Sequence, residues 1–137
     1  VDSLPDTQFT ASSYHSASGD LCQPHNAKIS SSDGTAWCSA TGGTGEYLQI
    51  EFIESKQIQS ITIYGRKSPD QWVEEYYFTH SVDSVTFVSA YNENDDITFI
   101  GNTNSSRITG AHSVLNETVI AKYVRITAIT ITKQEQS

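Results

Sequence analysis

The chain has 137 residues, a length that suits one domain with its own core, so we expect a single domain over residues 1–137. Its formal net charge of −8 opposes phosphate backbones and anionic lipid surfaces. Nucleic acid is therefore not an expected partner, and membrane insertion is disfavoured. Uncharged and cationic ligands remain open, and no apolar run reaches transmembrane length.

Short β-prone runs separated by turn signals follow one another along the chain, and no segment has a sustained helical period. The runs cover residues 8–13, 47–52, 61–64, 76–80, 85–88, 97–100 and 119–131. Leu48, Ile50 and Phe52 alternate with polar residues, which is typical of a strand with one buried face. We therefore predict an all-β fold of many short strands, either a sandwich or a flattened barrel.

Three local patterns place the strand boundaries. The polar residues 54–57 predict a turn between two strands. Residues 81–84 predict a hairpin turn that leads into a strand over residues 85–88. Within residues 119–131 the apolar positions change parity at Ala128, which indicates a bulge or a corner there, because the side chains of a strand alternate between its two faces.

Two sequons and two cysteines bear on the cellular compartment. Asn104 and Asn116 each begin an N-glycosylation sequon in a polar segment. Together with the Ser/Thr-rich, β-rich composition they favour a secreted or extracellular domain. In that setting a disulfide between Cys22 and Cys38 is favoured over two free thiols. The alternative is two small, buried hydrophobic side chains, which is how free cysteines commonly behave.

A charged and aromatic loop over residues 65–77 separates two predicted strands, and β proteins commonly carry their recognition chemistry on such loops. The Ser-Pro-Asp sequence at residues 68–70 interrupts any strand between them. Arg66 and Asp70 form a pair suited to sugar hydroxyls, because the guanidinium donates hydrogen bonds and the carboxylate accepts them. The alternative is a structural salt bridge that braces the loop.

Five segments, in order along the chain, resemble those of discoidin domains, also called coagulation-factor type C domains. They are residues 6–13, residues 34–38 with 47–52, residues 65–76, residues 99–103 and residues 120–126. The loop that contains Arg66 and Asp70 is most similar to that of the slime-mould discoidin lectins. The resemblance covers nearly the whole chain and implies an antiparallel jelly-roll barrel of about eight strands, which binds ligands and is not an enzyme.

The resemblance also implies where the ligand binds. Carried over by position, the binding loops at one end of the barrel are residues 14–25, 33–45 and 66–72, bordered by residues 102–116. Their candidate ligand-binding residues are aromatic, planar polar or charged, and comprise Tyr14, His15, His25, Trp37, Arg66, Asp70 and Gln71. Aromatic faces suit the apolar patch of a sugar ring, and planar polar groups suit its hydroxyls. For Trp37 the alternative is packing into the barrel end.

These loops predict an extracellular module that recognises glycans of the galactose type, on free glycans or on cell-surface glycoproteins. Glu74 and Glu75 are adjacent, so they point to opposite faces of a strand and make a poor acid/base pair. The four histidines have no metal or nucleophile spacing, so we do not expect an enzyme. The alternative function is a cell-adhesion or receptor module that binds a protein, a peptide or a phospholipid head group through the same loops.

One candidate metal turn and two departures from the discoidin pattern are also present. Asp33 lies in an Asp-Gly turn that resembles the metal turn of related galactose-binding modules, so calcium is a candidate cofactor there; the alternative is a plain turn with no cofactor. The terminal cysteine pair usual in the family is absent. The sequence after residues 120–126 does not match the family's last strand, so we expect that strand to be missing or diverged.

Overall fold

The computed structural model describes residues 3–28, 35–40, 44–66, 71–105 and 110–133 of the chain. Its elements are η1 (Asp6–Gln8), β1 (Phe9–Ala11), η2 (Ser16–Cys22), η3 (Pro24–Ala27), β2 (Tyr47–Ile63), β3 (Gln71–Ser81), β4 (Val88–Ser89), β5 (Phe99–Ile100) and β6 (Ala111–Lys133). The three η elements are short 3-10 helices. Within the described ranges, no helix has the length and apolar character that a membrane span requires.

Every strand pair in the sheet is antiparallel, which confirms the predicted all-β antiparallel architecture. The strand order is β1-β2-β6-β3-β4, and β5 pairs with β3. The long strands β2 and β6 therefore lie at the centre and carry most of the ladder. Six strands are present in the described part of the chain, where about eight were predicted, because β2 and β6 each cover the ground of two shorter strands.

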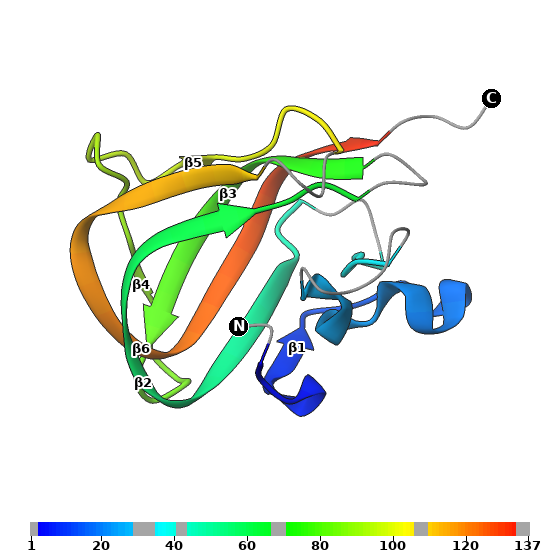
Figure 1. The fold of residues 1–137 in the computed structure, drawn as a ribbon, viewed down its shortest axis with the longest axis horizontal. Helices are drawn as coiled ribbons and strands as arrows, with labels where there is room; N and C mark the ends of the chain where they lie inside the picture. The colour runs from blue at the N-terminus through cyan, green and yellow to red at the C-terminus, as the bar shows by residue number, and fades with distance from the viewer. Residues whose placement is uncertain (1–2, 29–34, 41–43, 67–70, 106–109, 134–137) are drawn as a thin grey trace.

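The two long strands bend where their pairing register shifts. The first shift lies between Glu51 and Lys56 of β2, and the second between Ile58 and Ser60. Figure 1 shows both strands curling round on the left of the view, so that the two arms of each strand face one another across the core. The turn predicted at residues 54–57 is wrong, because the chain changes direction there through an irregular stretch inside one strand.

The ladder between β3 and β6 contains the irregularity predicted near Ala128. Tyr76 pairs with Ala128, but the next pair joins Glu75 to Thr130, so β6 has one extra residue at this point. The predicted bulge is therefore confirmed, and it accounts for the change of apolar parity along the strand. Beyond it, β6 continues beside β3 to Lys133. The C-terminal residues, where the last strand was expected to be missing or diverged, thus continue β6 as far as Lys133.

The hairpin between β3 and β4 begins later than predicted. Ser81 ends β3, and pairing resumes at Val88 rather than at residue 85. In between, the carboxylate of Asp83 accepts hydrogen bonds from the backbone N–H groups of Val85 and Thr86, at 2.9 and 3.0 Å. An Asp side chain that takes up backbone donors in this way competes with ladder pairing, so these residues form a loop.

Aromatic rings form the centre of the core. Phe99 is fully buried; the Tyr76 ring stacks on it with centroids 5.3 Å apart, and the Phe78 ring meets its edge at 6.3 Å. The buried cluster comprises Phe9, Ile50, Tyr76, Phe78, Ala90, Phe99, Leu115, Ala121 and Val124. These residues come from β1, β2, β3, β5 and both arms of β6, with Ala90 directly after β4, so the core joins the two sides of the curled sheet.

Candidate functional site

A disulfide joins the first two predicted binding loops. Cys22, the last residue of η2, is bonded to Cys38, and their Cα atoms are 4.9 Å apart. The backbone N–H of His15 donates to the carbonyl oxygen of Cys38 at 2.9 Å, and the N–H of Cys38 donates to that of Cys22 at 3.4 Å. The first and second predicted binding loops are therefore cross-linked to one another, on the right of the barrel in Figure 1.

Trp37 is held beside this bridge by its indole nitrogen. Its Nε1–H donates to the carbonyl oxygen of Ser13 at 2.9 Å, and the residue is half-buried. The hydroxyl of Ser13 donates to Glu46 Oε2 at 2.6 Å and accepts from the backbone N–H of Ala40 at 3.0 Å. The polar edge of Trp37 is thus satisfied within the protein, and its ring is oriented by a residue that closely follows β1.

Arg66 connects the third predicted loop to the disulfide. Its backbone exchanges hydrogen bonds with Gln71 at 2.7 and 2.9 Å. Its guanidinium Nη1 donates to Gln71 Oε1 at 2.9 Å and to Cys38 Sγ at 3.2 Å. Burial lowers the pKa of Arg66 from its ordinary value, because a charged guanidinium is less well solvated there. Asp70, its predicted partner, lies outside the described residues.

We call the group made by Tyr14, His15, Trp37, Arg66 and Gln71 around the disulfide the loop end. Tyr14 is 40% exposed and His15 is exposed, so both present their side chains to solvent. Five of the seven predicted ligand-binding residues therefore gather around one bridge, drawn from three separate stretches of the chain. Flat rings, a guanidinium and a carboxamide are the groups that bind hydroxylated ligands.

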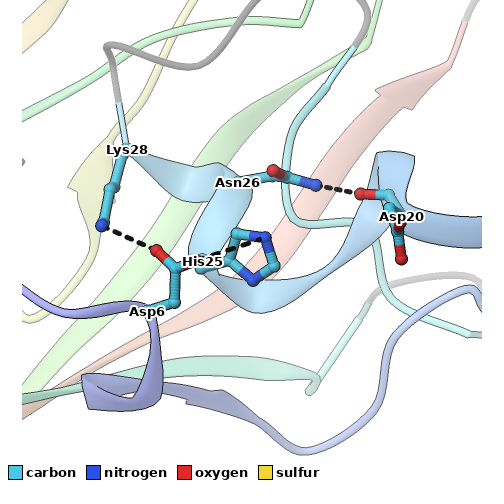
Figure 2. A network of polar contacts seen from close by, with 5 residues as sticks. All are labelled: Asp6, Asp20, His25, Asn26 and Lys28. Carbon is cyan, nitrogen blue, oxygen red and sulfur yellow. Dashed lines mark hydrogen bonds and ion pairs between the residues drawn. The ribbon is translucent and has the colours of Figure 1, made fainter.

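His25 is placed elsewhere, in a polar network at the base of η3. Its Nε2 lies 3.9 Å from Asp6 Oδ2, and Lys28 Nζ donates to Asp6 Oδ1 at 2.8 Å. Figure 2 shows the three side chains converging, with Asn26 donating to the carbonyl oxygen of Asp20 nearby. The hydrogen bond from Lys28 lowers the pKa of Asp6. The structure therefore pairs His25 with the first residue of η1.

The loop that follows β5 borders the loop end. A Cβ atom built on Gly65 would lie 2.5 Å from the Cα of Ser105, so these two backbones touch directly and only glycine fits at that position. Residues 101–104, together with Gly110 and Ala111, line a hollow of about 180 Å³. The predicted border of the binding loops therefore lies immediately beside the residue that precedes Arg66.

The structure describes the two predicted glycosylation sites but not the predicted metal turn. Asp33 lies outside the described residues, and in the part of the chain that is described no three His, Cys, Asp or Glu side chains gather as a metal site would require. Asn104 and Asn116 are both exposed, and Asn116 Nδ2 donates to Asp95 Oδ1 at 3.2 Å. Both asparagines are accessible from solvent.

Solved structures with this fold include a discoidin and a CBM32 module. Wild-type discoidin II from Dictyostelium discoideum superposes with a TM-score of 0.66 over 90% of this chain and 49% of its own, at 19% identity. The module CpGH89CBM32-5 from Clostridium perfringens superposes with a TM-score of 0.70 over 93% of this chain and 88% of its own, also at 19% identity. These similarities confirm the jelly-roll fold.

Curated sequences also match most of the chain. Retinoschisin of Takifugu rubripes is 26% identical over 104 residues, which are 75% of this chain and 37% of that protein. Coagulation factor V of Sus scrofa is 30% identical over 131 residues, 90% of this chain and 6% of its own length. A discoidin-1 polypeptide of Dictyostelium discoideum is 31% identical over 70 residues, 51% of this chain and 27% of its own.

The chain therefore spans well under half the length of each of these relatives. The family described as F5/8 type C domain matches residues 8–137, which includes every strand of the sheet. Fold and sequence agree over the same residues. The chain belongs to the F5/8 type C, or discoidin, domain family.

Proposed function

We propose that this chain is a binding module that recognises glycans of the galactose type through the loop end. The observation that carries the proposal is the fixed guanidinium of Arg66, whose Nη1 donates to both the Gln71 carboxamide and Cys38 Sγ. A planar donor held in one orientation binds vicinal hydroxyls at a low entropic cost. The exposed ring of Tyr14 and the half-buried ring of Trp37 supply apolar faces for the sugar.

The relatives support a carbohydrate ligand. The Clostridium perfringens module is described in complex with GalNAc-β-1,3-galactose, and the CBM32 module of AlyQ in complex with 4,5-unsaturated mannuronic acid. Those ligands are bound by proteins that share only the fold with this chain. The two complexes, together with the donors and rings of the loop end, favour a saccharide over a peptide as the ligand. They also favour binding rather than catalysis as the activity.

We place the module outside the cell. The disulfide between Cys22 and Cys38 is of the kind that persists in oxidising compartments. The sequons at Asn104 and Asn116 have accessible asparagines, as N-glycosylation requires. Glycans or glycoproteins of cell surfaces are the ligands available in that setting.

A phospholipid head group is the second candidate ligand, and one observation favours it. Leu21 is 48% exposed immediately before Cys22, at the same end as Tyr14, which is 40% exposed. Exposed apolar side chains on a loop tip can insert between lipids, with Arg66 close by to meet a phosphate. The net charge of −8 opposes an anionic membrane, so we rank this candidate below a glycan.

The test is a glycan array probed with the whole chain displayed in several copies, because single sugar sites are weak. We expect galactoside binding that free galactose competes away, and loss of at least about tenfold in Arg66→Ala, as removal of a charged hydrogen-bond donor predicts. Chelation of calcium in a parallel array tests the Asp33 turn. Liposomes containing phosphatidylserine provide the lipid arm.

The matched control is Lys56→Ala, which removes an exposed cation from the bend of β2. It should bind galactosides as the unmodified chain does. The proposal is wrong if Arg66→Ala keeps its melting temperature and binds the same glycans with unchanged affinity. Binding to liposomes together with a blank array would replace the glycan with the phospholipid.

A further inference from the structure

A second arginine occupies the outer face of the sheet. Arg125 lies in β6 directly after Val124, which is 4% exposed and belongs to the core. Because successive side chains of a strand point to opposite faces, Arg125 points outward. Its partners in the ladder are Gln49 of β2 on one side and Thr79 of β3 on the other. These three polar side chains form a row across the middle of the sheet.

Two aromatic rings enclose the guanidinium of Arg125. Its Cζ lies 4.2 Å from the centroid of Tyr47 and 3.9 Å from that of Phe87, and its Nε donates to Gln49 Oε1 at 2.7 Å. Such stacking holds the guanidinium plane in one orientation while its edge stays open. Neither terminal nitrogen of Arg125 has a partner among the described residues, and neither is a buried unsatisfied atom.

The Phe87 side of this enclosure is built by the loop between β3 and β4. Asp83 accepts from the N–H groups of Val85 and Thr86, the two residues directly before Phe87. The hydroxyl of Ser81, which is 4% exposed, also donates to Asp83 at 2.9 Å. These hydrogen bonds fix the loop. The Phe87 ring is therefore preorganised against the guanidinium in the absence of a ligand.

The charge of Arg125 is not matched by a carboxylate of the described ranges. The chain has 16 acidic and 8 basic residues, yet Arg125 makes no ion pair with any described carboxylate. Glu51 lies on the same face one diagonal step away, beside Tyr123. An accessible cation in an acidic protein, whose two terminal nitrogens have no partner among the described residues, is complementary to one external carboxylate.

The surroundings of Arg125 fit a sugar. Tyr77 is 39% exposed and takes the position diagonal to Arg125 on β3, at about 7–8 Å between Cα atoms. Thr79 and Thr127 place hydroxyls in the same two rows. A ring face, two hydroxyls and a guanidinium lie within the span of one or two sugar residues.

We propose that the outer face of the sheet around Arg125 is a second binding site, which takes a glycan carrying one carboxylate, such as a terminal uronic acid. The carboxylate pairs with the edge of the guanidinium, and the sugar ring lies over Tyr77. One negative charge is the limit, because Glu51 and the net charge of −8 repel each further one. Acidic glycans of high charge density are therefore poor ligands.

The test is a nuclear magnetic resonance titration of the whole chain with three probes at constant ionic strength. Methyl β-D-glucuronide has the ring and the carboxylate, methyl β-D-glucoside has only the ring, and acetate has only the carboxylate. We expect saturable shifts of the Arg125 Nε–H and of the Tyr77 and Thr79 amides with the glucuronide, at a Kd on the order of 1 mM. The other two probes should bind at least roughly tenfold more weakly.

Two variants locate the interaction. Arg125→Lys keeps the charge but loses the planar edge and the stacking, and should raise the Kd for the glucuronide at least roughly fivefold. Tyr77→Ala alters an exposed side chain and should therefore fold, so the proposal can still be tested if Arg125→Lys does not fold. This variant should raise the Kd for the glucuronide about threefold. Lys56→Gln, an exposed cation on β2, should leave it unchanged.

Three results would each overturn the proposal. Acetate binding as tightly as the glucuronide would make Arg125 a simple anion site. Glucoside binding as tightly would make the carboxylate irrelevant. Shifts confined to Arg66 and Gln71 would assign acidic sugars to the loop end, and this outcome is independent of whether galactosides bind there.

Discussion

The two arginines in the described part of the chain are both half-buried, and they are held in different ways. Arg66 is fixed by contacts between irregular segments, through Gln71 Oε1 and Cys38 Sγ, at an end of the barrel that a disulfide holds together. Arg125 is fixed on a regular ladder, between the rings of Tyr47 and Phe87. The loop end therefore depends on a cross-link between segments, whereas the sheet face depends on strand register.

This difference predicts that the two regions differ in their resistance to local unfolding. The register around Arg125 is secured by hydrogen bonds to strands on both sides, whose amides exchange slowly in a stable sheet. The segments around Arg66 contribute short 3-10 helices and loops with few ladder bonds. We therefore expect the loop end to open before the sheet face under stress.

The largest effect should come from Phe99→Ala, which removes the ring at the centre of the core and disrupts both regions. Loss of a fully buried phenylalanine lowers the free energy of unfolding by about 3–5 kcal/mol. Ile100→Ala is the matched control, since this neighbour in β5 is 64% exposed and should change stability by less than about 1 kcal/mol. Urea unfolding of the two variants measures both values, and equal destabilisation would contradict the assigned core.

An intermediate effect, limited to the loop end, is expected when the disulfide is removed. Replacing both Cys22 and Cys38 by serine removes a cross-link between residues 16 positions apart. We expect this to lower the free energy of unfolding by about 3 kcal/mol. Amide exchange should accelerate at His15 and Arg66 while Arg125 keeps its protection. Uniform acceleration over all three residues would show that the two regions are not independent.

The smallest effect, limited to the sheet face, should come from protonating Asp83. Hydrogen bonds from the Thr86 and Val85 backbones, with that of Ser81, lower the pKa of this carboxyl below its ordinary value. The carboxylate therefore stabilises the loop fully above about pH 4, the pKa of an unfolded aspartate. That contribution is lost as the pH falls through the lower folded value.

The measurement is the protection factor of the Val85 and Thr86 amides between about pH 5 and pH 2.5, a range that begins above the ordinary pKa of an aspartate and ends below it, with the Phe87 ring resonances as a second probe. We expect protection to decline over this range and the ring to leave its stacked position. Asp83→Asn should have weaker protection at every pH and no decline. A decline that persists in Asp83→Asn would assign the titration to another group, and binding at the proposed galactoside site of the loop end should be unaffected.

Strand content and strand faces could be predicted from the order of residues, with local exceptions. The alternation in residues 47–52 predicted the buried face of β2, and the parity change at Ala128 predicted the bulge in β6. The turn predicted at residues 54–57 failed because polar, exposed residues look the same in a turn and in the bend of a long strand. Side-chain hydrogen bonding by Asp83 likewise delayed β4.

Within the candidate site, the sequence predicted which types of residue are present. It predicted only in part which of them lie together. Tyr14, Trp37 and Arg66 were predicted from their chemistry and do meet around the bridge, whereas His25 pairs with Asp6. The contact between Arg66 and Cys38 joins positions 28 residues apart, and no local pattern announces it. It arises because the second loop, which the disulfide ties to the first, also lies beside the third.

The sequence by itself determined the all-β class, the family and the chemical inventory of the loops, because alternation and turn residues act over a few neighbours. Only the tertiary structure decided which side chains meet. Arg125 reads as one more polar position in a strand, and its enclosure by Tyr47 and Phe87 depends on pairing between β2 and β6 and on the loop that Asp83 holds. Sites of that kind are made by register between distant segments, which local sequence does not encode.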